Sequence, residues 1–389
     1  MQIYLDNSAT TAICDEALST YTRISKFEFG NPSSLHELGV RAEAEIKKAR
    51  EELLLSLGIK HGHAVFCGSG TEANNLAIFG RAFAKERYSR GAKIIISAGE
   101  HASVSEPVYA LKKMGFEVVE ISTRGGVFDL DELTRVLDDK CILVSVMLVN
   151  NETGAVYDIP SIARLVKART RDCLLHLDAT QGYLKIPFTK NGVGADLITV
   201  SSHKIEGPKG VGALVIDEGV IKARGLAPII LGGGQEGGLR SGTENVPAIA
   251  AFGTAIQVGY TNMATRVKYT KELRDYLISE IQKKGELKDL VINNPPMHAP
   301  HILSITLPDI KSETVLHFLS ARGIYVSSGS ACSSNTGHKS AALLAYGKTE
   351  GEADTTVRAS ISYRNTKEEL DVFVNALCDA VSTLAKIRR

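Results

Sequence analysis

Short apolar runs alternate with longer stretches of helical periodicity through the first two thirds of the chain. Strands are predicted at residues 64–67, 93–97, 116–121, 141–148, 174–177, 196–200 and 211–216, and helices at 71–89, 104–114, 129–137 and 160–167. The run at 141–148 is almost wholly apolar, as is typical of a strand buried on both faces. Alternating strands and helices of this kind predict a mainly parallel sheet with helices on both faces.

The pattern changes after Pro247. Residues 248–284 contain many helix-forming residues and no strand signal, which predicts one long helix or two. Beyond them, strand-like runs at 302–307, 324–327 and 358–362 alternate with helical runs at 311–321 and 367–386. We therefore predict an α/β fold with a large domain at residues 16–256 and a smaller α+β domain made of residues 1–15 and 257–389.

Charge and cysteine content narrow the class of protein. The chain carries 45 basic and 44 acidic residues, whereas nucleic-acid-binding proteins usually show a basic excess. Its longest apolar stretch is far shorter than the roughly 20 residues that cross a membrane, and no targeting segment is recognisable. Six irregularly spaced cysteines without a CxxC pair indicate reduced thiols and no metal motif. We expect a cytoplasmic protein that acts on a small molecule, without nucleic-acid or membrane partners.

Three residues whose side chains could take part in catalysis follow predicted strands. Lys204 lies just after the strand at 196–200, Asp178 directly follows the strand at 174–177, and His101 comes after the strand at 93–97. Each has a plain alternative, since loop lysines are common, an Asp often caps a helix and a single His is more often structural. The carboxyl ends of parallel strands, however, are where ligands bind in open α/β sheets. There a neutral lysine amine can attack a carbonyl group, and a carboxylate can hold a protonated ring nitrogen.

A turn rich in small residues, Gly68-Ser69-Gly70-Thr71, joins a predicted strand to a helix. Free N–H groups at a helix start favour an anion such as phosphate, although an ordinary capped turn is equally compatible with this sequence. The turn matches neither a Walker A loop nor GxGxxG, so ATP and NAD are not indicated. Asn151 and Gln181 follow strands at the same edge. Together these groups predict a site for pyridoxal 5'-phosphate. Enzymes that use this cofactor hold it through a lysine Schiff base and an Asp at the ring nitrogen.

Cys332 stands apart from the other cysteines. It lies within Ser327–Gly337, a run of small, polar residues, whereas Cys141 lies in an apolar strand. Buried cysteines are usually inert, but an exposed thiol on a flexible loop is a candidate nucleophile. We therefore predict a functional role for Cys332 and structural roles for the other five cysteines.

Motifs spread over nearly the whole chain resemble those of the cysteine desulfurases of the NifS/IscS type, in the class V aminotransferase group of fold type I pyridoxal-phosphate enzymes. The matching segments are Tyr4-Leu5-Asp6-Asn7-Ser8-Ala9-Thr10-Thr11, Gly30-Asn31-Pro32-Ser33-Ser34, Gly70-Thr71-Glu72, Glu100-His101, Asn150-Asn151-Glu152, Asp178-Ala179-Thr180-Gln181, Ser201-Ser202-His203-Lys204, Arg240-Ser241-Gly242-Thr243-Glu244-Asn245, Ser328-Gly329-Ser330-Ala331-Cys332 and Arg358. So many motifs in matching order make a chance resemblance very improbable.

The resemblance implies a role for each matching residue. Lys204 would bind the cofactor as a Schiff base, His101 would stack on its ring and move protons, and Cys332 would accept sulfur. The cofactor would further contact Asp178 at the ring nitrogen, Gln181 at the phenolic oxygen, Thr71, Ser201 and His203 at the phosphate, and Gly70 and Asn151. Thr243 would reach the phosphate from the other subunit of a homodimer. Asn31, Asn151 and Arg358 would bind the substrate carboxylate.

The implied reaction is the removal of sulfur from L-cysteine, which gives L-alanine and a persulfide on Cys332. The sulfur would pass to an acceptor protein for the biosynthesis of iron–sulfur clusters or another thio-cofactor. A selenocysteine lyase or another class V enzyme with the same cofactor remains an alternative. A cofactor-free scaffold or binding protein is a third possibility, disfavoured because both Lys204 and Asp178 are present.

The chain departs from the family pattern at several positions. Gly237 stands where the family usually has Arg, and Ser362-Tyr363-Arg364 stands where it commonly has Ser-Arg-aromatic. Gly337-His338-Lys339-Ser340 replaces a frequent Glu-Pro-Ser-His sequence. The chain ends at Arg389, soon after its last predicted helix, whereas relatives that serve an iron–sulfur scaffold often have a further segment. These departures leave the core chemistry unchanged but leave the sulfur acceptor open.

Overall fold

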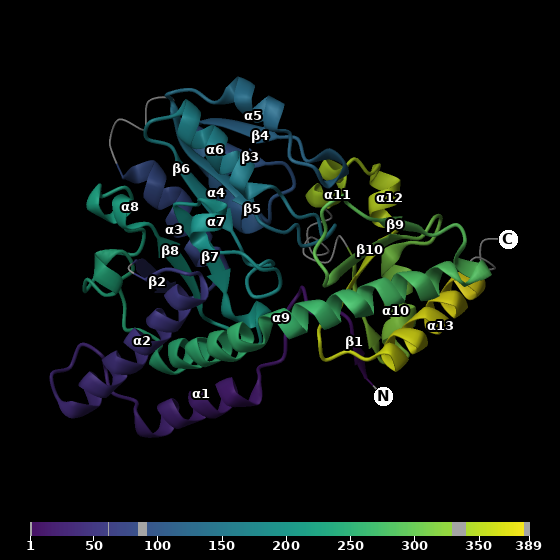
Figure 1. Ribbon diagram of the computed structural model, residues 1–389, viewed down its shortest axis with the longest axis horizontal. Coiled ribbons are helices and arrows are strands. Elements are labelled where there is room, and N and C mark those ends of the chain that lie inside the picture. Colours follow the sequence, from purple (N-terminus) through teal and green to yellow (C-terminus); the bar gives the residue numbers. More distant parts are fainter. Residues whose placement is uncertain (1, 61, 85–91, 329–339, 385–389) are drawn as a thin grey trace.

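The computed structural model describes residues 2–60, 62–84, 92–328 and 340–384. Within them, a seven-stranded sheet with the order β2-β8-β7-β6-β5-β3-β4 forms the centre of the larger part (Figure 1). Its strands are β2 (His63–Cys67), β3 (Lys93–Ser97), β4 (Glu117–Ile121), β5 (Cys141–Met147), β6 (Leu174–Asp178), β7 (Leu197–Ser201) and β8 (Gly212–Ile216). β8 is antiparallel to β2 and β7, and the other neighbouring pairs are parallel. The prediction of a mainly parallel sheet is confirmed.

Helices cover both faces of this sheet. The helices in this part of the chain are α1 (Asp15–Phe27), α2 (Glu37–Ser56), α3 (Gly70–Phe83), α4 (Ala102–Lys113), α5 (Leu130–Val136), α6 (Ile159–Arg169), α7 (Lys190–Val193) and α8 (Glu218–Lys222). Apolar side chains of α3 and α4 pack in one core with β3, and those of α2 and α6 pack in another with β5. The βα alternation seen in the sequence thus produces the layered architecture.

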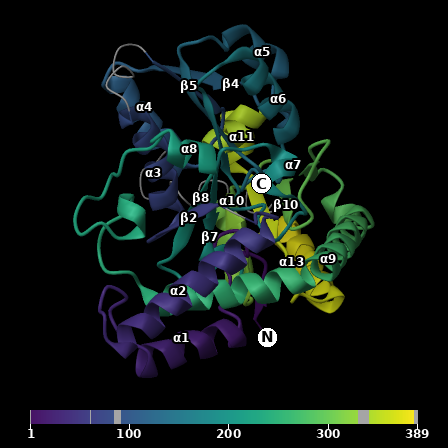
Figure 2. The ribbon, with the colours of Figure 1, turned by 60° about the vertical axis from the view of Figure 1, so that its left-hand side comes forward.

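The sequence pattern did not predict α1 or α2. α1 buries only Ala17 and Ile24, and most of its residues are polar, so it contains no apolar run that stands out in the sequence. α2 has buried residues at helical spacing, but alanines such as Ala42 and Ala49 occupy some of those positions and dilute the hydrophobic signal. Both helices contact α9 (Val246–Gln282), along which they lie in Figure 2.

A smaller sheet with the order β12-β13-β10-β9 lies in the second part of the molecule (Figure 1). Its antiparallel strands are β9 (Val291–Asn293), β10 (Ile302–Thr306), β12 (Ser327–Ser328) and β13 (Thr356–Ser360). β1 (Ile3–Tyr4) pairs separately with β11 (Ile324–Tyr325). The accompanying helices are α10 (Ser312–Ser320), α11 (Ala341–Tyr346), α12 (Glu350–Asp354) and α13 (Lys367–Leu384), and short 3-10 turns occur at Arg124–Gly126, Ser202–Lys204, Glu236–Gly238 and Gly285–Leu287.

The long helix α9 joins the two parts. It is one continuous helix of 37 residues, so the first of the two possibilities left by the sequence is the correct one. Its first half buries Phe252 in a core beneath the large sheet, and its second half buries Leu277 in a separate core that also contains Ile3. On this arrangement we propose a domain boundary near residue 256, with the first 15 residues joined to the smaller domain. Within the described residues, no helix has both the length and the apolar character needed to cross a membrane.

Candidate active site

A cavity of about 410 Å³ opens at the carboxyl ends of β5, β6 and β7. Side chains from both sheets and from the segment after β1 surround it. The sequence-selected residues that line it are Gly70, Thr71, His101, Asn151, Asp178, Gln181, Ser201, His203, Lys204 and Arg358. Other lining residues are Asp6, Ser8, Ala9, Ser69, Ser103, Met147, Val149, Thr180 and Ser327. The carboxyl edge of the sheet therefore gathers most of the candidate residues into one site.

Three selected residues lie elsewhere or cannot be placed. Asn31 is exposed, outside the cavity, and its side-chain oxygen accepts a hydrogen bond from the Ser33 N–H at 2.9 Å. Thr243 is also exposed and does not line the cavity of its own chain. Cys332 falls outside the described residues. The roles assigned to these three residues remain predictions.

Lys204 ends the short 3-10 turn that follows β7. Its Nζ donates hydrogen bonds to the backbone carbonyls of Ser8 at 2.5 Å and Ala9 at 2.7 Å. The same N-terminal segment is held to this turn by Thr11, whose N–H and hydroxyl both donate to the His203 carbonyl at 2.9 Å. The sequence motif around Asp6–Thr11 was recognised without a role, and the structure shows that it positions the lysine amine.

Asp178 is the last residue of β6 and is only 6% exposed. Its Oδ1 accepts a hydrogen bond from the Thr180 N–H at 2.9 Å, and its Oδ2 accepts one from Asn74 Nδ2 at 2.8 Å. Both partners are N–H donors, which suit an ionised carboxylate. Asp178 is therefore a fixed negative charge on the cavity wall.

Asn74 and Ser103 link this carboxylate to His101, and the sequence analysis gave neither of them a role. Asn74 Nδ2 also lies 2.8 Å from Ser103 Oγ, to which it donates. The Ser103 hydroxyl lies 2.8 Å from His101 Nδ1, and the Ser103 N–H donates to the same nitrogen at 3.1 Å. Asn74 follows Thr71 by three residues on α3, so helical spacing was the available signal that it shares a face with the cavity-lining residue.

The protonation of His101 follows from these contacts. Because Nδ1 accepts the Ser103 N–H, the neutral imidazole carries its proton on Nε2. Desolvation in the cavity lowers the pKa of His101 below its ordinary value, the charge of Lys204 adds to this effect, and that of Asp178 opposes it. His101 is therefore a neutral imidazole with one N–H available on the ring edge away from Ser103.

The start of α3 forms the opposite end of the site. Ser69 caps this helix by accepting the Glu72 N–H at 3.1 Å, and Gly70 is its first residue. A Cβ on Gly70 would lie 3.1 Å from Ser201 Cβ, so glycine permits close approach of the helix start to the end of β7. Burial and the charge of Lys204 lower the pKa of His203 to about 4, which leaves this ring neutral at pH 7. Free N–H groups, hydroxyls and a neutral ring here can hold a phosphate.

Arg358 reaches the cavity from β13 of the smaller sheet and is 7% exposed. One terminal nitrogen donates to Asp6 Oδ1 at 2.8 Å, and the other donates to the Asn151 carbonyl at 2.8 Å. Its Nε has no hydrogen-bond partner among the described residues. A planar guanidinium at a cavity wall suits the bidentate binding of a carboxylate.

These residues fit pyridoxal phosphate. A fixed carboxylate, an amine and a helix start without a side chain at Gly70 line one cavity, and they match the ring nitrogen, the aldehyde and the phosphate of this molecule. Gln181 is held by its Nε2, which donates to the Ser8 carbonyl at 2.8 Å. The cavity thus contains groups suited to each part of this molecule.

The five described cysteines are unfavourable nucleophiles. They are Cys14, Cys67, Cys141, Cys173 and Cys378, and burial is the largest cause of a raised pKa for each thiol. A thiol with a raised pKa contains little of the reactive thiolate at neutral pH. The described part of the chain therefore offers no competitor to Cys332.

Glu100 provides a test of the electrostatics beside the site. Its carboxyl accepts hydrogen bonds from Ser97 Oγ and from the Met147 N–H, and burial raises its pKa to about 8. This pKa is higher in the folded than in the unfolded chain. Protonated Glu100 therefore contributes its full share to the free energy of unfolding below about pH 4.5, and this contribution is lost as the pH rises to 8. Relative to the wild type, Glu100→Gln should therefore gain roughly 3 kcal/mol of stability between pH 5 and 8. Urea unfolding at both pH values measures this difference.

Glu106→Gln is the matched control for this experiment, because Glu106 is exposed on α4. Its stability difference from the wild type should stay constant between pH 5 and 8. A stability difference for Glu100→Gln that is equally constant would contradict the buried, protonated state of Glu100.

Comparison with known proteins agrees with the fold and the cavity. The family described as Aminotransferase class-V matches residues 3–373. The chain therefore belongs to the class V aminotransferase family. It is 36% identical to Cysteine desulfurase IscS of Dictyoglomus turgidum over 99% of this chain and 96% of that protein. It is also 36% identical to Cysteine desulfurase IscS 1 of Archaeoglobus fulgidus, over 98% of this chain and 97% of that protein.

Solved structures give the same result. A structure described as a NifS-like protein has a TM-score of 0.90 and 34% identity, and the match covers 98% of this chain and 100% of that chain. A structure described as SspA in complex with cysteine has a TM-score of 0.80 and 28% identity, and the match covers 94% of this chain and 100% of that chain. The predicted fold class and the resemblance to NifS/IscS-type proteins are confirmed.

Proposed function

We propose that this protein is a cysteine desulfurase that uses pyridoxal phosphate to remove sulfur from L-cysteine, giving L-alanine and a persulfide on Cys332. The observation that carries this proposal is the single cavity that contains Lys204, Asp178, His101 and Arg358. The near-complete overlap with proteins named cysteine desulfurase supports it.

Each end of the cavity has a part in the proposed reaction. When bound, pyridoxal phosphate supplies an electron sink that makes the Cα–H bond of the amino acid acidic and its Cβ–S bond labile. Asp178 holds the proton on the ring nitrogen, and the start of α3 with Ser201 and His203 binds the phosphate. Arg358 binds the substrate carboxylate and so fixes which bond at Cα faces Lys204. The amine of Lys204 then removes the Cα proton.

Sulfur transfer requires a proton donor and a nucleophile. His101, with its proton on Nε2, moves protons between the substrate and the cavity. The thiolate of Cys332 attacks the substrate sulfur, so that an S–S bond forms while the Cβ–S bond breaks. The three-carbon fragment takes up one proton at Cβ, the proton removed from Cα returns to it, and the fragment leaves as alanine. The persulfide then carries the sulfur to an acceptor protein.

The remaining assignments concern assembly and setting. We infer a homodimer in which Thr243 reaches the phosphate site of the other subunit, since Thr243 is exposed and lies outside the cavity of its own chain. We retain Asn31 as a proposed substrate contact, although the folded chain places it outside its own cavity. A cytoplasmic enzyme that supplies iron–sulfur cluster or thio-cofactor biosynthesis is the setting that we propose.

The replacement Cys332→Ala tests the proposed chemistry. The variant should bind pyridoxal phosphate and cysteine, as followed by absorbance in the near-visible range. Its release of sulfide in the presence of a thiol reductant should fall at least about a thousandfold, because the nucleophile is lost. The partly buried Cys378 gives the matched control Cys378→Ala, which should keep normal sulfide release. Full activity of Cys332→Ala on cysteine would overturn the persulfide mechanism, and full activity on selenocysteine alone would favour a selenocysteine lyase.

A further inference from the structure

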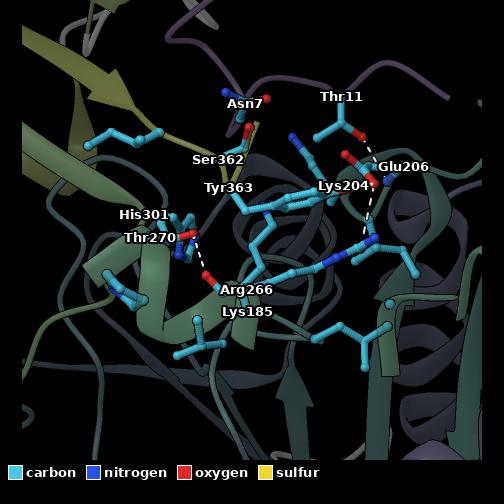
Figure 3. A pocket seen from close by; sticks show the side chains of 16 residues that line it. Asn7, Thr11, Lys185, Lys204, Glu206, Arg266, Thr270, His301, Ser362 and Tyr363 are labelled. Carbon is cyan, nitrogen blue, oxygen red and sulfur yellow. Dashed lines mark hydrogen bonds and ion pairs between the residues drawn. The ribbon is translucent and has the colours of Figure 1, made fainter. Parts of the chain in front are cut away.

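A second, smaller cavity of about 70 Å³ lies between Lys204 and α9. Figure 3 shows the side chains of Lys185, Arg266, His301 and Tyr363 gathered around it. Lys204 lines both cavities, whereas these four residues do not line the larger one. The proposed function gives this cavity no task.

The only carboxylate among the lining residues, Glu206, already has its charge balanced. Tyr363 Oη donates to it at 2.6 Å and Arg364 Nε donates to it at 2.5 Å. Arg266 Nη1 lies 3.6 Å from the same carboxylate, and its guanidinium stacks over the Tyr363 ring at 4.0 Å from the centroid. Tyr363 and Arg364 are among the positions at which this chain departs from the family pattern. Glu206 is thus committed to these partners.

Lys185 lacks a comparable partner. Among the described residues, its Nζ forms no ion pair, and it donates a long hydrogen bond of 3.5 Å to Gln181 Oε1. Burial, together with the positive charges of Lys204 and Arg358, lowers the pKa of this amine to about 7, and the smaller effect of the Glu206 charge opposes them. An ammonium group in such surroundings requires a counter-charge to remain protonated.

His301 is the second unsatisfied group. The residue is 4% exposed, and neither of its ring nitrogens makes a well-formed hydrogen bond among the described residues, although a weak contact with the Gln181 backbone raises its pKa. Burial lowers its pKa well below the ordinary value, and the charge of Lys185 contributes, so the ring is neutral and has one N–H to donate. Buried N–H groups in proteins almost always have a good partner, and a group inside the cavity can supply a better one than the weak Gln181 contact.

We propose that the cavity binds a small monovalent anion such as chloride between Lys185 and His301. The anion supplies the missing counter-charge for the lysine and accepts the imidazole N–H. The volume admits an ion of one or a few atoms, and Leu184, Val267 and Ile361 make part of the wall apolar, which favours a weakly hydrated ion. Lys185, Lys204 and Arg266 outnumber Glu206 among the charged lining residues, so the local charge also favours an anion.

Bromide provides a direct probe, because its anomalous X-ray scattering identifies it in a crystal of the full chain. We expect a bromide peak between Lys185 and His301 in the wild type. The peak should be absent in Lys185→Met and weakened in His301→Leu. Absence of a wild-type peak, with ordinary water density in its place, would overturn the proposal.

Thermal unfolding of the full chain measures the same binding in solution. Chloride should replace gluconate at constant ionic strength, so that general screening does not change. We expect chloride to raise the wild-type Tm by about 2 °C or more near saturation, since a ligand that binds only the folded state stabilises it. Lys185→Met and His301→Leu should lose this rise. Lys268→Met, which removes an exposed lysine from α9, should retain it.

The outcomes separate this proposal from the proposed function. Equal chloride responses in the wild type and both cavity variants would contradict the anion site whatever the enzymatic activity. If Lys185→Met does not fold, His301→Leu and the wild-type bromide peak still decide the question. Loss of desulfurase activity in any variant would carry no weight here, because both readouts are independent of catalysis.

Discussion

Replacing Lys204 with alanine should lower the rate of alanine formation from cysteine at least about a thousandfold. In our proposal, this amine binds the cofactor covalently and removes the Cα proton. Its position is fixed by the carbonyls of Ser8 and Ala9, so no other lysine can take its place without rebuilding that segment. The purified variant should also lack the near-visible absorbance that appears when pyridoxal phosphate is bound to a lysine.

Lys209→Ala is the matched control, because Lys209 lies five residues further along the same loop and is exposed. It should retain both the absorbance and at least about half of the activity, as expected of a surface substitution. Loss of activity in both variants would point to general damage of the loop. A Lys204→Ala protein that keeps the absorbance and the rate would rule out Lys204 as the cofactor lysine.

Replacing Asp178 with asparagine should lower kcat by at least about a hundredfold, the usual scale for removing a buried electrostatic partner from an active site. The substitution preserves shape, and Asn74 can adapt to it because its unpartnered Oδ1 can turn toward the new amide. The fold should therefore persist, while the negative charge that we propose to hold the ring-nitrogen proton is lost. Parallel measurements of kcat, cofactor affinity and Tm test this separation.

Asp196→Asn offers the same chemical change just before β7, at the opposite, amino end of that strand. Asp196 Oδ2 accepts the Leu175 N–H at 2.8 Å, so this control detects effects of losing a partly buried carboxylate on the sheet. We expect Asp196→Asn to lower Tm more than kcat. Equal loss of kcat in the two variants would contradict a specific electrostatic role for Asp178.

The location of the candidate site could be predicted because it depends on strand order. The apolar run at 93–97 predicts a buried strand, and β3 has the same bounds. Since parallel strands end at one edge, any polar residue just after such a run is placed near the others. Asp178 and Lys204 both follow such runs, and both line the cavity. Most strands of the large sheet could also be predicted, because each is a continuous run of mainly apolar residues.

Contacts between distant segments were not predictable from local pattern. The Lys204 amine binds carbonyl groups near the N-terminus, almost 200 residues away, and carbonyls carry no residue-specific signal. Lys185 and His301 are unremarkable in the sequence, and only packing against α9 makes them line one cavity. Glu206 is paired with Arg364 for the same reason. Local periodicity determines which residues form an element, but pairs of this kind depend on how elements pack.

The pairing of β1 with β11 has a consequence for the order of events during protein synthesis. Ile3 lies opposite Ile324, and the next bridge joins Asp6 to Ser360. The N-terminal segment cannot take its final position until the ribosome has made nearly the whole chain. Because the carbonyls that hold the Lys204 amine belong to that segment, the large sheet can form early while the lysine remains unplaced. Competence to bind the proposed cofactor in its final geometry should therefore arise only near the end of translation.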